Sequence, residues 1–145
     1  MVFMCQHKTH ETVWLPELIK HANGANGLAA IIAISDQPEA TAEGFARLFS
    51  AGTANQEDGH WQVYTGPRSA AIIVYDREAA ESIYGKAVVN STPQGAFASL
   101  RVQVTALSKT RAALDGNNIT YTTTSNGIII APVDASGTIL EFSEA

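Results

Sequence analysis

The stretch NGIIIAPVDASGTILEF, residues 126–142, decides the fold of this chain. Two short apolar runs are separated by a segment containing Pro, Asp, Ser and Gly, which predicts two strands joined by a turn. In the second run Leu140 and Phe142 share one side of the strand, so Glu141 points to the opposite side. We expect Leu140 and Phe142 to pack under a helix. Glu141 then faces away from the helices and is a candidate site residue.

The residues before this stretch complete a repeating unit. FASLRVQV (97–104) alternates as a strand, 108–114 is predicted as a short helix that stops at Gly116, and ITYTT (119–123) is a further strand. With the two closing strands, the order is strand, helix, strand, strand, strand.

The first half of the chain predicts the same order. GLAAIIAIS (27–35) is a continuous apolar run typical of a strand covered on both faces. A helix follows, with Asp36 and Glu39 as a capping box and apolar residues at helical spacing as far as Gly52. A short strand near 53–57, then WQVYT (61–65) and SAAIIVYD (69–76) around a Gly-Pro turn, complete the unit.

The matching order favours an internal duplication. We therefore predict an α+β fold with two βαβββ modules, 27–94 and 95–145, forming one curved mixed sheet with helices on the convex side. Residues 1–26 are expected to be an N-terminal strand and helix extension, in which 2–6 form the strand. Trp14, Leu15, Leu18 and Ile19 form an apolar stripe at helical spacing. This stripe must be buried, and we expect a homodimer.

The concave face of the sheet is the predicted ligand site. Alternation in 97–104 places Ser99, Arg101 and Gln103 on the side away from Leu100, Val102 and Val104. Alignment of the two halves places Ala29, Ile31 and Ala33 at the equivalent positions of the first strand. The predicted concavity is therefore small and apolar in one half, and polar in the other.

The composition excludes several classes of function. The 145 residues carry a formal net charge of -5 without basic runs, which argues against a nucleic-acid partner. The single cysteine, Cys5, fits a reducing compartment and excludes an intramolecular disulfide. The N-terminus lacks a signal-peptide pattern and no apolar run is long enough to cross a membrane. We expect a cytoplasmic protein with no membrane partner.

The paired units and the closing APVDASGTILEF resemble the vicinal oxygen chelate superfamily, which includes the glyoxalases, bleomycin-resistance proteins and ring-cleaving dioxygenases. The resemblance covers 27–143, and its most specific part is Gly-x-x-x-Glu-Phe (137–142). LSKTRAALDGNNITY (107–121) is similar to the family's short helix and next strand. The N-terminal residues are similar to the linker of two-domain glyoxalase-like proteins.

The resemblance implies four metal-ligand positions. In this sequence they fall on Ala29, within Ile72 to Val74, on Ser99 and on Glu141, so one ligand of the four is kept. A zinc site needs about three protein ligands. We therefore expect no metal and no cofactor, as in the superfamily members that bind small molecules without a metal, typically as dimers.

The leading hypothesis is a metal-free small-molecule-binding protein of the glyoxalase and bleomycin-resistance type, acting by sequestration or sensing. The predicted ligand-binding residues are Ala29, Ala33, Trp61, Ser99, Arg101, Gln103 and Glu141. No catalytic residue is assigned. Arg101 and Glu141 could orient a polar ligand or pair with each other, and Trp61 could contact an aromatic ligand or pack in the core.

Two alternatives remain open. One is a divalent-metal lyase or isomerase in which other ligands join Glu141, with His60 the first candidate. The other is a degenerate interaction module whose concavity is filled by its own side chains. Cys5 and His7 could also form a metal pair, but no further donor is evident nearby.

Overall fold

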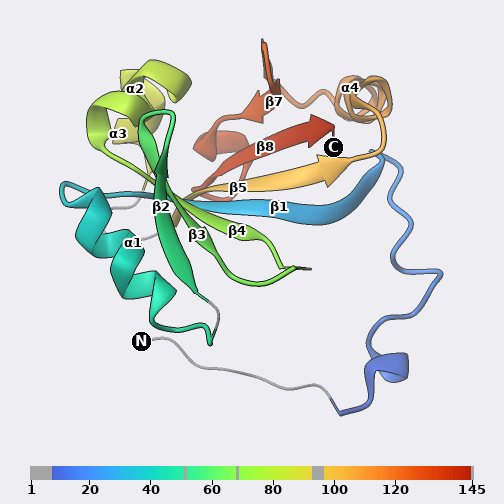
Figure 1. Cartoon of the computed structure of the whole chain (residues 1–145). Helices are drawn as coiled ribbons and strands as arrows, with labels where there is room; N and C mark the ends of the chain where they lie inside the picture. The colour runs from blue at the N-terminus through green and yellow to red at the C-terminus, as the bar shows by residue number, and fades with distance from the viewer. Residues whose placement is uncertain (1–7, 51, 68, 93–96, 145) are drawn as a thin grey trace.

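The computed structural model describes residues 8–50, 52–67, 69–92 and 97–144. Its centre is an eight-stranded sheet in the order β2-β3-β4-β1-β5-β8-β7-β6 (Figure 1). The strands are β1 (Ala25–Ile34), β2 (Thr53–Glu57), β3 (His60–Tyr64), β4 (Ala71–Tyr75), β5 (Phe97–Val104), β6 (Thr122–Thr124), β7 (Gly127–Ile130) and β8 (Ile139–Glu144). The α-helices are α1 (Pro38–Ala46), α2 (Arg77–Tyr84), α3 (Lys86–Asn90) and α4 (Leu107–Gly116), and the 3-10 helices are η1 (His10–Thr12) and η2 (Pro132–Asp134). Among the described residues, no helix is long and apolar enough to cross a membrane.

The two halves of the chain meet at the middle of the sheet. Strands β1 and β5 pair antiparallel there. On either side of them, β4 lies parallel to β1 and β8 lies parallel to β5. Each half thus contributes a strand, a helix and three further strands in the same spatial order. The predicted fold class, α+β with two βαβββ units in one curved mixed sheet, is confirmed.

Helices α1 and α4 cover one face of the sheet, which we call the outer face. Under α1 the core includes Ala42, Val63 and Val74. Under α4 it includes Leu114 and Phe142, with Leu140 packed beside them. Removal of this apolar surface from water is the main stabilising term for such a two-layer arrangement. Leu140 and Phe142 therefore pack under a helix as predicted.

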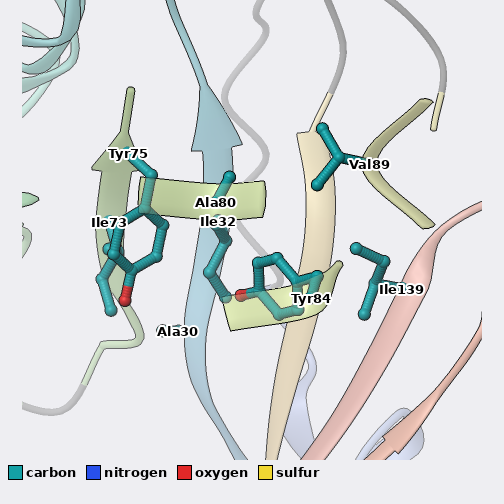
Figure 2. Packing of buried hydrophobic residues seen from close by; sticks show 8 residues of the cluster. All are labelled: Ala30, Ile32, Ile73, Tyr75, Ala80, Tyr84, Val89 and Ile139. Carbon is teal, nitrogen blue, oxygen red and sulfur yellow. The ribbon is translucent and has the colours of Figure 1, made fainter. Parts of the chain in front are cut away.

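Helices α2 and α3 cover part of the opposite face, which we call the inner face, and they were not predicted. Ala80 and Tyr84 of α2 and Val89 of α3 pack against Ile32 and Ile139 of the sheet (Figure 2). The expectation that helices lie on the convex side therefore holds for α1 and α4 only. The inner face is consequently covered over β1 and β4.

The helix starts differ from the prediction at α1. The expected cap Asp36 is not used: the N-cap is Gln37, and the Ser35 hydroxyl accepts a hydrogen bond from the Gln37 N–H at 3.0 Å. Helix α1 ends at Ala46, before the predicted stop at Gly52. A side-chain cap does occur at α2, where Asp76 accepts from the Ala79 N–H at 2.7 Å.

A bulge in the central strand pair overturns the predicted faces of β1. The β1–β5 register shifts between Leu28 and Ala30, where Ala29 is an extra residue on β1. Because side chains alternate strictly, a shift of one residue exchanges the two faces. Ala33 therefore packs with the α1 core on the outer face. Ala29 lies in this bulge, without a partner on β5.

The expected helix around the N-terminal apolar stripe is not formed. Residues 13–19 form turns and bends. Trp14, Leu18 and Ile19 remain 54–63% exposed among the described residues. The predicted strand 2–6, Cys5 and His7 lie outside the described residues.

Candidate functional site

Three side-chain donors converge on Glu141 at the centre of the inner face. The Tyr84 hydroxyl donates to Oε1 of Glu141 at 2.7 Å, and the Ser99 hydroxyl donates to the same oxygen at 2.6 Å. Nε of Arg101 donates to Oε2 at 3.0 Å. We call these four residues the Glu141 cluster.

The cluster brings together residues far apart in the sequence. Arg101 and Glu141 are neighbours across the parallel β5–β8 pair. Tyr84 comes from the end of α2 and lies between Ile32 and Ile139 in Figure 2. The hydroxyl of this otherwise apolar side chain thereby reaches the carboxylate.

Three of the four residues of the Glu141 cluster are almost completely buried. Ser99 is 0%, Tyr84 7% and Glu141 8% exposed. A carboxylate removed from water is costly unless charged and hydrogen-bonding partners replace the lost hydration. Here the guanidinium and the two hydroxyls supply that replacement, and charge-assisted bonds of this kind are the strong ones.

The surroundings raise the pKa of both Tyr84 and Arg101. Burial is the largest cause of the raised pKa of Tyr84, followed by the charge of Glu141 and the hydrogen bond to it. Burial alone would lower the pKa of Arg101, but the charge and hydrogen bond of Glu141 outweigh it and raise that pKa. Tyr84 is thus held as a neutral donor and Arg101 as a cation.

A hollow of about 300 Å³ opens beside the cluster on the inner face of the second half of the sheet. Its lining includes Arg101, Thr124, Asn126, Ile129, Glu141 and Ser143. This volume is at the lower end of the range typical of small-molecule pockets. We call it the inner-face hollow. Helix α2 covers the inner face over β1 and β4, but it does not fill this hollow.

The structure brings together four of the predicted site residues and separates three. Ser99, Arg101, Gln103 and Glu141 share the inner face, as the β5–β8 register requires. Trp61 packs against the α1 core on the outer face, with Ala33, because it pairs with Val74 of β4. Ala29 lies in a bulge.

Strand register locates the four positions that the superfamily resemblance implies. The β1–β5 pairs Ala30–Arg101 and Ile32–Ser99 flank the pair Ile31–Leu100, so a pseudo-twofold axis there relates Ser99 to Ala30 and Arg101 to Ile32. Glu141 is beside Arg101, and Ile73 is beside Ile32. The positions are therefore Ala30, Ile73, Ser99 and Glu141, with Ala30 in place of the predicted Ala29.

The described residues contain no group of three or more His, Cys, Asp and Glu side chains that could hold a metal ion. His60, the first suspect for an additional ligand, has its ring 5.3 Å from the Tyr75 ring.

Tyr84 is the site residue that sequence reasoning missed. The signal for its helix was present: Asp76 is followed by REAAESIY (77–84), with Ala80 and Tyr84 at helical spacing on one face. Nothing in that pattern indicates that the helix crosses the inner face, because this placement depends on the long connection from β4 to β5.

Solved structures with a similar arrangement include methylmalonyl-CoA epimerases. A methylmalonyl-CoA epimerase from Mycobacterium tuberculosis matches with a TM-score of 0.63 at 16% identity, over 86% of this chain and 95% of that one. A variant of the Streptomyces coelicolor methylmalonyl-CoA epimerase, in complex with 2-nitronate-propionyl-CoA, matches with a TM-score of 0.55 at 13% identity, over 83% and 98%. No protein-family model matches the chain, and no curated protein matches its sequence significantly.

These matches, at such low identity, show the fold. Together with the strand order, they confirm the resemblance at that level: this chain has the vicinal oxygen chelate fold.

Proposed function

We propose that this protein binds a small molecule in the inner-face hollow without a metal ion. The observation that carries the proposal is the Glu141 cluster: the one carboxylate at the four superfamily positions is bound to Tyr84, Ser99 and Arg101. The hollow beside it remains open to a ligand. Sequestration or sensing is the role that such a site can perform.

The residues at the four superfamily positions do not fit a divalent metal. Ala30 and Ile73 have no donor atom, and the Ser99 hydroxyl donates its hydrogen to Glu141. Metal sites need several oxygen, nitrogen or sulfur ligands in fixed geometry. A dication at Glu141 would also lie close to the Arg101 guanidinium, which is 3.0 Å from the carboxylate, and would be repelled by it.

The second candidate is a metal-dependent isomerase or lyase. Its support is the similarity to the methylmalonyl-CoA epimerases, whose chains are matched over 95% and 98% of their length. Fold alone does not carry a reaction, because one fold hosts many functions. A metal-dependent function here requires Arg101 to leave Glu141 and further ligands to join it.

A thermal-shift screen of small molecules separates these candidates. Under our proposal a binding compound raises the melting temperature equally with excess chelator and with added divalent metal. Thr124→Trp should fill the hollow and abolish the shift. Thr123→Trp is the matched control, since Thr123 is opposite Ile128 on the outer face. A shift that requires metal supports the isomerase.

A screen without any stabilising compound favours the third alternative, an interaction module. Tyr84 already fills the centre of the inner face, as that alternative requires. The inner-face hollow favours our proposal over the interaction module, because the protein's own side chains do not fill the inner face over the second half of the sheet.

We also propose that the protein acts as a homodimer. Trp14, Ile19 and Leu28 line a second hollow of about 320 Å³ and are all more than 40% exposed. Exposed apolar groups that are contiguous in this way are typical of association surfaces. Sedimentation should give a dimer at micromolar concentration, and a monomer would contradict the proposal.

A further inference from the structure

We propose that the ligand of the inner-face hollow is a small organic carboxylate and that Arg101 is the residue that recognises it. This inference rests on the proposed function and adds its ligand class. The Arg101 guanidinium is a fixed cation at the centre of the fold. It lies beside Glu141, the one carboxylate at the four superfamily positions.

The geometry of Arg101 leaves donors for a ligand. An arginine has five N–H bonds, and the contact with Glu141 uses the one on Nε. The terminal amino groups carry the other four. Tyr75 is the smallest of the causes that raise the pKa of Arg101, and even a hydrogen bond to its hydroxyl oxygen would occupy at most two of these N–H groups. Within the described part of the chain at least two N–H bonds therefore remain, and paired guanidinium N–H groups match the two oxygens of a carboxylate.

Arg101 is held in place by Glu141 but is still partly exposed to solvent. Its side chain is 27% exposed, whereas the side chain of Glu141 is 10% exposed, and both line the hollow. The neighbouring carboxylate fixes one edge of the guanidinium. Because a fixed guanidinium loses less conformational freedom when a ligand binds, Glu141 is a positioning residue for Arg101.

Two carboxylates, Glu141 and Glu144, line the hollow, and their repulsion of an anionic ligand is reduced in different ways. The charge of Glu141 is matched by Arg101. Glu144, which also lines the hollow, accepts a hydrogen bond from the Leu107 N–H at 2.6 Å, at the start of α4. The positive end of the helix dipole and this N–H offset part of its charge. Both carboxylates are therefore at least partly neutralised, and the positive charge of Arg101 can attract an anionic ligand.

The remaining lining fits a short hydrocarbon and a few polar contacts. Ile129 is opposite Glu141 in the β7–β8 pair and supplies an apolar wall. Ser143 and Asn126 supply polar groups at the rim of the hollow. A small acid with an apolar body can thus place its carboxylate on Arg101 and its body on Ile129.

The test compares benzoate and propionate with benzamide and propionamide, which have the same shape without the charge, and uses inorganic phosphate as a further anion. Binding is measured by calorimetry on the full chain. We expect the acids to bind about tenfold or more tightly than the amides, since charge-assisted bonds exceed neutral ones by this order. Arg101→Lys keeps the charge but loses the paired geometry, and should weaken acid binding about tenfold and amide binding by less.

The wild-type comparison of acids with amides needs no variant, so a folding defect in Arg101→Lys cannot decide the result. Equal binding of acid and amide, with loss of both in Thr124→Trp, would overturn the carboxylate assignment and leave the proposed function standing. Preference for phosphate over both acids would also overturn it. If neither acid binds in the wild type, the carboxylate assignment fails, and the proposed function is then decided by the thermal-shift screen.

Discussion

At the scale of single residues, the position of Glu141 determines the buried polar cluster of the inner face. Alternation along the strand placed Glu141 on the inner face, and the register places it beside Arg101. Of the two roles considered for these charges, pairing with each other is observed. Pairing does not exclude ligand binding, because only Nε is used in the contact.

The first prediction concerns the charge of Glu141. Glu141→Gln keeps the shape of the side chain but leaves a half-buried guanidinium without its counter-charge, and should lower the free energy of unfolding by about 2 kcal/mol. Urea denaturation measures this change. Glu57→Gln, on an exposed strand position, should change it by less than about 0.5 kcal/mol. Equal effects of the two substitutions would mean that the cluster does not stabilise the fold.

The second prediction concerns the hydroxyl of Tyr84. The pKa of this group is raised in the folded protein, so its contribution to stability is complete below the ordinary tyrosine value of about 10 and is lost as the pH rises above it. Tyr84→Phe has no such group. In alkaline urea denaturation the wild type should therefore lose stability with pH more steeply than Tyr84→Phe. Parallel curves would contradict a buried, protonated Tyr84.

At the scale of helices and strands, the prediction was accurate wherever a periodic pattern faced the core on one side. Strands β5 and β8 alternate clearly and were found with the correct faces, whereas Trp61 of β3 lies on the outer face and not on the predicted concave face. Strand β1 is apolar on both faces around Ile31, so no alternation is visible and the bulge at Ala29 could not be seen. This single irregularity accounts for the wrong placement of Ala33.

Helix caps offer the third prediction. Asp76→Ala removes the bond to the Ala79 N–H and should destabilise the protein by about 1 kcal/mol. Asp36→Ala is the matched control: the same residue type at the start of α1 makes no cap contact, so its effect should stay within about 0.5 kcal/mol. Chemical denaturation of both variants checks this difference. The reverse order would show that Asp36 is the functional cap, as the sequence pattern indicated.

At the scale of the whole molecule, the duplicated order of elements was enough to predict the sheet, but not what covers its inner face. The two units are defined by local patterns that recur along the chain. The position of α2 depends on a contact between Tyr84 and Glu141, which are 57 residues apart. Contacts of this range leave no periodic trace in a single sequence. The site was therefore predicted for its strand residues and missed for the helix residue that completes it.

The four superfamily positions illustrate the same limit. The resemblance implied that one metal ligand of four is kept, and the strand register moves one of the four positions from Ala29 to Ala30. The arrangement of Tyr84, Ser99 and Arg101 around that ligand required coordinates. It is this arrangement that supports a ligand site without a metal.

The most direct test of the account is the metal content of the purified protein. The chain is expressed in medium containing manganese, cobalt, nickel and zinc, and bound metal is measured by mass spectrometry, with melting curves for each metal and for chelator. Because Arg101 already neutralises Glu141, the account predicts far less than one ion per chain and no metal-dependent shift in melting temperature. One ion per chain that stabilises the wild type and is lost in Glu141→Ala would contradict it.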